Sequence, residues 1–224
     1  MPRPALRKVD ARLDLSNYLL TPEDVARPFD AGDLYGRDAP LEVEVGSGKG
    51  LFLENAAAAN PAHNFFGIEV AKVYAHRCAA RLARRSLTNG RMLHGDGQWF
   101  FREALTPGSV AAVHVYFPDP WWKKRHHKRR VLNEPFIADV VRVLQPNGVL
   151  DFWTDVRDYY EATLELLAAN TPLQGPIEVE AAQATHDLDY RTHFERRTRL
   201  AGEPVYRCQF KKPIGELPQP IAAD

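Results

Sequence analysis

The stretch LEVEVGSGKG, residues 41–50, decides the fold, because it carries a short apolar strand straight into a glycine-rich turn that opens a helix. Glycines in this setting let the backbone turn tightly and let a ligand approach it closely. The spacing is GxGxG, which differs from the GxGxxG of dinucleotide binders and lacks the Gly-Lys-Ser/Thr ending of a phosphate-binding loop. Taken alone, the motif is a weak signal, because a generic tight turn also explains some isolated matches.

Outward from this stretch, short apolar runs alternate with longer segments of helical composition. Predicted strands cover Leu41–Val45, Phe65–Ile68, Met92–Leu93, Val110–Phe117, Val149–Trp153 and Val205–Phe210. Predicted helices cover Leu51–Ala59, Val70–Arg85, Phe136–Leu144 and Val156–Ala169, and the stretch Thr192–Leu200 leads into the last strand. Such alternation means parallel pairing with right-handed crossovers, so the predicted fold class is α/β with a doubly wound, mostly parallel sheet.

The length of 224 residues suits one domain, which we assign to residues 39–212. Residues 1–38 have no strong hydrophobic period and are predicted to be an N-terminal extension, disordered in part. The segment 213–224, with three prolines in its first eight residues, is predicted to be a loose C-terminal tail.

Acidic residues recur where successive predicted strands end: Glu44, Glu69 and Asp96. Because ligands of an open parallel sheet lie outside the carboxyl ends of the strands, these residues are expected to share one cleft with Gly46 and Gly48. Glu69 is placed to accept from ribose hydroxyls and Asp96 from an adenine amino group. An acid-lined cleft repels phosphate and suits a positive sulfonium, which favours S-adenosylmethionine over NAD. The alternative for each acid is a helix-capping role.

Composition excludes several classes. No apolar run reaches the roughly 18 residues of a spanning helix, and residues 1–10 lack the apolar stretch of a secretion signal, so we expect a cytoplasmic protein with no membrane partner. Cys78 and Cys208 are predicted to be reduced structural thiols. The 29 basic and 29 acidic residues cancel, but residues 123–130 hold six Lys or Arg and no acid, which is typical of a binder of a polyanion.

The strand ending at Phe117 runs into PDPWWKKRHHKRR, residues 118–130. Here the sequence resembles the bacterial tRNA (guanine-N7)-methyltransferase family, whose motif reads FPDPW followed by KKRHHKRR. Trp122 departs from the family, which usually has Pro there. Further similar stretches are Val45–Gly50, Gly67–Val70, Thr154-Asp155 and Thr192–Arg197, so the resemblance spans about residues 41–210.

The resemblance implies a Rossmann-like class I methyltransferase fold of seven strands, the last antiparallel. It also implies S-adenosylmethionine as cofactor and a guanine in the variable loop of tRNA as substrate. Asp119 is then the catalytic residue and a neighbour of the cofactor. The residues implied to contact the substrate are Lys123, Asp155, Thr192, His193, Phe194 and Glu195. We expect the RNA backbone to be held by Lys124, Arg125, Lys128, Arg129 and Arg130, with no metal, in a monomer or homodimer.

Alternatives remain at several of these positions. The basic run is also compatible with a solvated helix face or a nuclear localisation signal. The charges around Glu195 are also compatible with an ordinary network of surface ion pairs. Trp121 or Trp122 can stack on a base or fill the core. At the level of function, the alternatives are a methyltransferase with another acceptor and a non-catalytic RNA-binding protein that keeps a cofactor cleft.

Overall fold

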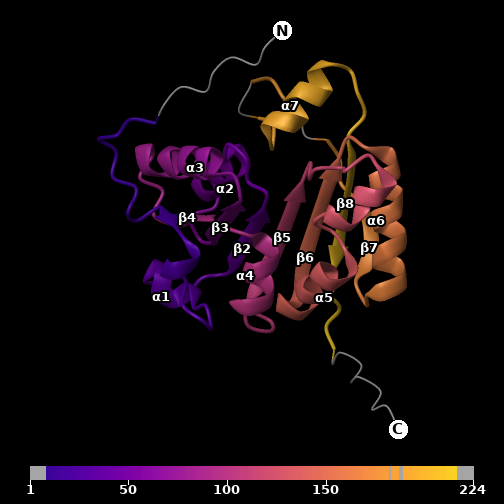
Figure 1. Cartoon of the computed structure of the whole chain (residues 1–224), viewed down its shortest axis with the longest axis horizontal. Coiled ribbons are helices and arrows are strands. Elements are labelled where there is room, and N and C mark those ends of the chain that lie inside the picture. The colour runs from indigo at the N-terminus through magenta and orange to yellow at the C-terminus, as the bar shows by residue number, and fades with distance from the viewer. Residues whose placement is uncertain (1–8, 182, 187–188, 216–224) are drawn as a thin grey trace.

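The structure is a computed structural model that describes residues 9–181, 183–186 and 189–215. In this part of the chain, eight strands form a single sheet with helices on both of its faces (Figure 1). The strands are β1 (Leu19–Leu20), β2 (Leu41–Val45), β3 (Asn64–Glu69), β4 (Gly90–His94), β5 (Val110–Tyr116), β6 (Leu144–Thr154), β7 (Gln174–Glu178) and β8 (Tyr206–Lys211).

The strand order is β1-β4-β3-β2-β5-β6-β8-β7. Pairing is parallel from β1 to β6, whereas β8 runs antiparallel to both β6 and β7. The prediction of a doubly wound, mostly parallel α/β sheet with its last strand antiparallel is therefore confirmed. The sheet has one strand more than the seven expected, because Leu19 and Leu20 of the N-terminal extension pair with Met92 and Leu93 of β4.

The helices are α1 (Ala31–Tyr35), α2 (Leu51–Ala59), α3 (Lys72–Arg84), α4 (Gly97–Glu103), α5 (Glu134–Val143), α6 (Arg157–Asn170) and α7 (His193–Leu200). Two 3₁₀ turns, η1 (Pro22–Asp24) and η2 (Lys124–Arg129), complete the described elements. Helices α4, α5 and α6 cover one face of the sheet, and α2 and α3 cover the other. Helix α7 stands beyond the ends of β5, β6 and β8 (Figure 1). No helix among the described residues has the length and apolar character needed to cross a bilayer.

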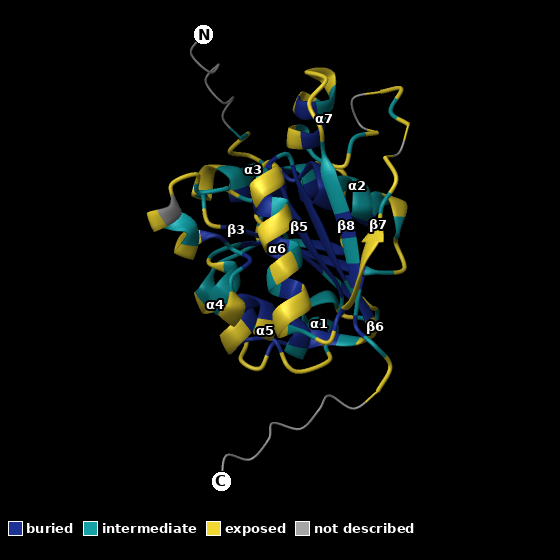
Figure 2. Cartoon of the chain, turned by 90° about the vertical axis from the view of Figure 1, so that its right-hand side faces the viewer, coloured by how far each residue is buried: buried dark blue, intermediate teal, exposed yellow. Residues whose placement is uncertain are grey.

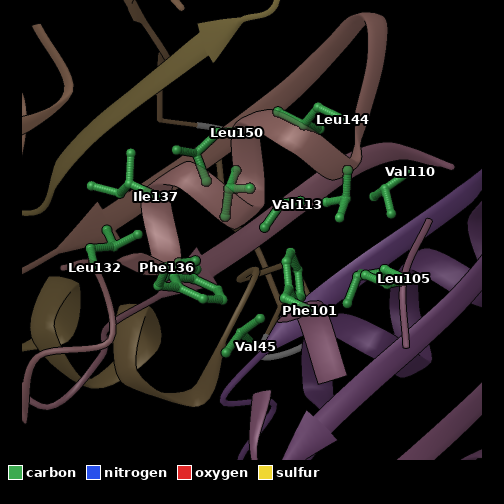
Figure 3. Close-up of a cluster of buried hydrophobic side chains, with 14 of the residues drawn as sticks. Val45, Phe101, Leu105, Val110, Val113, Leu132, Phe136, Ile137, Leu144 and Leu150 are labelled. Atoms are coloured by element: carbon green, nitrogen blue, oxygen red, sulfur yellow. The ribbon is translucent and has the colours of Figure 1, made fainter. Parts of the chain in front are cut away.

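Period-two alternation in β2 decides which side chains reach the core. Leu41, Val43 and Val45 enter the main apolar cluster, and Glu42 and Glu44 therefore point to the opposite face. Figure 3 shows part of this cluster, where Val45, Phe101 and Phe136 lie close to Val113 and Leu150. Each fully buried side chain of this kind contributes about 1.5–3 kcal/mol to stability. The outer face of α6, in contrast, is exposed along its length (Figure 2).

The described part of the N-terminal extension, residues 9–38, packs onto the sheet. Phe29 is buried and meets the rings of Phe66 and Phe100 edge-on, with centroids 5.2 and 5.1 Å away. The Tyr35 hydroxyl donates to the carbonyl of Phe65 at 2.7 Å. The predicted disorder in this extension therefore has no counterpart in residues 9–38, and residues 1–8 lie outside the described part of the chain. So does most of the predicted C-terminal tail, residues 216–224.

Candidate cofactor and substrate site

The glycine-rich loop joins β2 to α2 through left-handed backbone. Gly46, Gly48 and Gly50 have φ of 82°, 53° and 74°, values that side chains with a Cβ rarely adopt. The amides of Gly46 and Ser47 both donate to the carbonyl of Ile68, which ties the loop to β3. A Cβ at Gly46 or Gly48 would meet no atom within 4 Å. The loop therefore leaves open space in front of its backbone.

Glu69, at the end of β3, is fixed by backbone amides on both sides. Its Oε2 accepts from Gly48 N at 2.9 Å, and its Oε1 accepts from Ala71 N at 2.8 Å. The carboxylate thus joins the glycine loop to the start of α3. Each of its oxygens has a second lone pair, so the acceptor capacity that a ribose hydroxyl needs is still present.

Asp96, beyond the end of β4, is the N-cap of α4. Its Oδ1 accepts from Gln98 N at 2.8 Å, so the capping alternative describes this oxygen correctly. The side chain is nevertheless exposed to solvent. Capping and ligand binding are compatible here, because one carboxylate oxygen orients the group and the other is left for a ligand.

Glu44 is the most buried of the three acids, with 3% of its surface exposed, and its Oε2 has no hydrogen-bond partner within the described structure. Burial raises the pKa of Glu44 to about 7, although the Ser47 hydroxyl and the charge of His114 act against the rise. A buried carboxylate oxygen without a partner is costly unless a ligand satisfies it. The cationic groups of S-adenosylmethionine fit this requirement.

The Asp119 loop follows β5 and is bracketed by strained backbone. Phe117 and Trp121, on either side of Pro118-Asp119-Pro120, have φ of 48° and 49°. Such strain in residues other than glycine is concentrated at functional sites. Asp119 itself is exposed and borders an open hollow, which is lined by Asp119, Pro120, Trp121, Trp122, Lys123 and His126. Asp155, half-buried, follows the neighbouring strand β6, so the two carboxylates lie at adjacent strand ends.

The two tryptophans in this hollow differ. Trp122 is 73% exposed, so it does not fill the core. Trp121 is half-buried, with the guanidinium of Arg129 over its ring at 5.0 Å and His126 edge-on at 6.0 Å. Of the pair, Trp122 is the one whose ring faces are available to a ligand.

The basic segment, residues 123–130, forms η2 and does not present all its charges to solvent. Lys123, Arg125, Lys128 and Arg129 are exposed, whereas the side chain of Lys124 lies outside what the structure describes. Arg130 points inward: it is 9% exposed, donates to the carbonyl of Pro120 at 2.9 Å and lies 4.4 Å above the ring of Tyr159. This environment differs from the phosphate contact expected of Arg130 and suits a residue that holds the Asp119 loop.

The segment before and within α7 reaches the same region from a distant part of the chain. Thr192 is the N-cap of α7, and its side chain accepts from Glu195 N at 3.0 Å. Phe194, 48% exposed, stacks on Phe117 with centroids 6.1 Å apart, which brings α7 beside the Asp119 loop. The ring of His193 lies 3.3 Å from Arg81 of α3, and burial followed by the Arg81 charge lowers the pKa of this histidine.

Glu195 has an environment that the sequence did not suggest. It is 2% exposed, and it accepts from Arg191 N at 2.7 Å, from Arg199 at 3.2 Å and from Arg207 at 3.0 Å. The charge network around it is therefore buried rather than on the surface. Its acceptors are occupied within the protein, so its contribution to a substrate contact would come through the position of α7.

Sequence reasoning also missed polar residues on the Glu44 face of the sheet. His114 of β5 lies between two acids, with Nε2 2.8 Å from Glu42 of β2 and Nδ1 3.0 Å from Asp151 of β6. Burial alone would lower the pKa of His114, but the hydrogen bonds that His114 donates to Asp151 and Glu42 raise it to about 9. The signal was present as alternation, because His114 and Tyr116 share one face of β5. Arg191, in an irregular segment, had no such signal.

The described residues contain no group of three or more His, Cys, Asp or Glu side chains that could hold a metal ion. Of the six predicted cofactor residues, Glu44, Gly46, Gly48, Glu69 and Asp96 lie around the glycine loop, and Asp119 follows the neighbouring strand β5. Asp119, Asp155, Lys123 and Phe194 gather at the adjoining ends of β5 and β6.

Comparison with known proteins identifies relatives over most of the chain. Residues 38–208 match the model of a family described as putative methyltransferases. The tRNA (guanine-N(7)-)-methyltransferase of Rhodopirellula baltica is 51% identical over 95% of this chain and 80% of its own length. The enzyme of the same name from Bordetella pertussis is 38% identical over 83% of this chain and 72% of its own length.

Solved structures support the fold. The 16S rRNA methyltransferase KamB aligns with a TM-score of 0.58 at 16% identity, over 81% of this chain and 91% of that protein. The 16S rRNA (adenine(1408)-N(1))-methyltransferase from Catenulisporales acidiphilia aligns with a TM-score of 0.56 at 19% identity, over 84% and 91%. At such identities the likeness speaks for the fold alone. Sequence identity over nearly the whole length, together with the methyltransferase family match, shows that this chain belongs to the tRNA (guanine-N7)-methyltransferase family.

Proposed function

We propose that this protein transfers a methyl group from S-adenosylmethionine to N7 of a guanine in the variable loop of tRNA, giving 7-methylguanosine. The observation that carries the proposal is the position of Asp119. Its rigid, exposed loop adjoins a glycine-rich cleft whose acids suit a cationic donor, in a chain 51% identical to a protein named for this activity. A tRNA substrate also implies that the protein acts in the cytoplasm.

Five residues hold the cofactor in this proposal. Gly46 and Gly48 allow its close approach, and Glu69 accepts from the ribose hydroxyls while two amides hold it in place. Asp96 accepts from the adenine amino group. Glu44 offers its unpartnered oxygen to the positive end of the molecule. The cofactor supplies an electrophilic methyl group on a sulfonium.

The chemistry at the guanine requires positioning more than proton transfer. N7 has an in-plane lone pair and no hydrogen, so its alkylation needs no base to remove a proton. The reaction moves positive charge from sulfur to the purine ring, and S-adenosylhomocysteine leaves. Carboxylates at Asp119 and Asp155 can accept from guanine N1–H and N2–H and stabilise that developing charge. Pro118 and Pro120 restrict the backbone that carries this carboxylate.

The tRNA is held beside this centre by exposed charge and aromatic surface. Lys123, Arg125, Lys128 and Arg129 face solvent next to the Asp119 hollow and are suited to phosphate contacts. Trp122 offers an exposed ring at this hollow, and Phe194, stacked on Phe117 and covered by the Arg197 guanidinium at 4.5 Å, adds aromatic surface beside it. Arg130 supports the loop from inside.

Incubation of the purified protein with methyl-labelled cofactor and unmodified tRNA, followed by digestion to nucleosides, tests the proposal. We expect the label in 7-methylguanosine. Label in another nucleoside would indicate a different acceptor atom, and cofactor binding without transfer to any RNA would support a non-catalytic RNA-binding protein. Either result would contradict the proposed function.

A further inference from the structure

Arg191 reaches from the α7 segment over the ends of the central strands. Its guanidinium lies 5.0 Å from the ring centroid of Trp153, 5.4 Å from that of Phe52 and 5.6 Å from that of Tyr116. One of its Nη atoms donates to the Tyr116 hydroxyl at 2.9 Å. Aromatic faces attract a guanidinium, so these three rings form a seat for it.

The backbone of Arg191 is held as firmly as its side chain. Its amide donates to buried Glu195 at 2.7 Å, and Glu195 also accepts from Arg199 and Arg207. The Arg207 guanidinium in turn lies 4.9 Å from the same Trp153 ring. The guanidinium of Arg191 is therefore positioned before any ligand arrives.

This position is next to the cofactor cleft. Phe52 is the second residue of α2, which begins directly after Gly50, so a guanidinium over Phe52 stands at the end of the glycine loop. Tyr116 ends β5, the strand that leads to Asp119 and pairs with β2. The charge of Arg191 is also close enough to act against the rise in the pKa of Glu44 that burial causes. Arg191 thus lies between the glycine loop and the strand that leads to the Asp119 loop.

The cofactor needs a cation at this end of the cleft. S-adenosylmethionine carries an α-carboxylate beside its α-ammonium, yet Glu44, Glu69, Asp96 and Asp119 are all acids. Acids attract the ammonium and sulfonium but repel the carboxylate. Among the residues that the structure describes, the Arg191 guanidinium donates only to Tyr116, so its remaining N–H groups are left for a ligand. Their planar arrangement matches a carboxylate.

We propose that Arg191 binds the α-carboxylate of S-adenosylmethionine, opposite Glu44, whose unpartnered oxygen accepts from the α-ammonium. The proposal rests on the cofactor site of the proposed function and adds the residue that recognises the amino-acid end. The competing explanation is that Arg191 acts only as a strut that fastens the α7 segment to the aromatic seat. The two explanations differ in whether the effect of Arg191 depends on the carboxylate of the ligand.

Calorimetric titration with three ligands separates them. The ligands are S-adenosylmethionine, decarboxylated S-adenosylmethionine, which keeps the ammonium and sulfonium, and 5′-methylthioadenosine, which lacks the amino-acid end. Arg191→Met keeps an unbranched apolar side chain in the aromatic seat and removes the guanidinium with its charge. We expect it to weaken S-adenosylmethionine binding about ten- to hundredfold, as for loss of hydrogen bonds to a charged group, and to change the other two affinities less than about twofold.

Two further variants guard against a folding artefact. Arg191→Lys keeps the charge without the planar donors and should retain part of the preference for the carboxylate-bearing ligand. Arg199→Met loosens the Glu195 network without touching the aromatic seat, and it should leave the ratio of the three affinities unchanged. Melting temperatures followed by circular dichroism show whether each variant is folded.

An equal loss for all three ligands in Arg191→Met would identify a strut and overturn the proposal, as would no loss at all. Both outcomes leave the proposed function intact, because the wild-type protein still binds the cofactor. A wild-type protein that binds none of the three ligands would instead contradict the cofactor site itself, and this inference with it.

Discussion

The cofactor side and the substrate side of the site differ in how firmly the protein holds their side chains before a ligand binds. On the cofactor side, Glu69 is held by two amides, Asp96 by one, and Glu44 is buried. On the substrate side, Asp119 and Lys123 are exposed on a loop, and Trp122 projects into solvent. Hydrogen bonds within the fold and burial hold the acids of the cofactor side, whereas the groups of the substrate side are exposed to solvent.

This difference follows from the size of each ligand. A small cofactor must be bound by a cleft that is ready before it arrives, since immobilising several side chains would cost affinity. A tRNA brings many phosphates and a large surface of its own, so exposed charges and rings can be ordered as it binds. Changes on the two sides should therefore separate cofactor affinity from RNA affinity.

The largest effect is expected from Asp119→Ala. Loss of one carboxylate that orients the base and stabilises developing charge should lower the single-turnover rate by about 10²-fold or more. The affinity for tRNA should change far less, because phosphate contacts dominate it. Asp158→Ala, which removes an exposed acid in the first turn of α6, is the matched control. Equal rates for the two variants would remove Asp119 from the reaction.

The double change Lys128→Ala and Arg129→Ala should weaken tRNA binding by at least about tenfold at moderate salt. It should also reduce the slope of log affinity against log salt by about 2, one for each lost phosphate contact. Cofactor affinity should stay the same. Arg84→Ala with Arg85→Ala, an adjacent pair at the end of α3, provides the comparison. A salt titration identical to that of the wild type would show that η2 does not hold the RNA backbone.

Cofactor affinity should depend on pH through Glu44. Its pKa in the folded protein is raised to about 7, so the carboxyl is ionised at pH 8 and mostly protonated at pH 6. The cationic cofactor prefers the ionised form, and its affinity should fall about tenfold between these values, as linkage to one proton requires. Glu44→Gln should bind more weakly and lose most of this dependence. If Glu44→Gln kept the full pH dependence of cofactor affinity, a group other than Glu44 would be responsible for it.

The smallest effect is expected from Trp122→Ala, because stacking on one base contributes about 1–3 kcal/mol. We expect tRNA affinity to fall roughly fivefold or somewhat more, with no change in melting temperature, since the ring is 73% exposed. Trp122→Phe should retain much of the affinity. If alanine lowered the melting temperature instead, the ring would belong to the fold and not to the RNA surface.

Periodic segments were the ones that the sequence predicted well. The strands β2, β3 and β5 and the helices α2, α3, α5 and α6 agree with prediction within a few residues, whereas β6 begins at Leu144, before its predicted start at Val149. Weakly patterned elements were missed. Strand β1 has two residues, α4 has seven, and all five residues of β7 are exposed, so none of them carries an alternation that a pattern can reveal.

Among the site residues, too, the sequence predicted some positions and missed others. Glu44, Glu69 and Asp96 follow from the rule that ligands bind at strand ends, because each acid directly follows or ends a periodic strand. Arg130 does not differ from its neighbours in a run of basic residues, and only the ring of Tyr159 and the carbonyl of Pro120 explain why it turns inward. Glu195 likewise resembles a surface acid until three arginines from separate positions surround it.

The charged row Glu42–His114–Asp151 crosses three neighbouring strands inside the sheet. With His114 protonated, its positive charge lies between the carboxylates of Glu42 and Asp151, so loss of His114 alone would remove the cation that both buried acids share. Such a loss costs about 3–5 kcal/mol, whereas joint replacement by apolar residues of similar volume is often neutral. We therefore expect a homologue that lacks His114 to have exchanged its acidic neighbours as well.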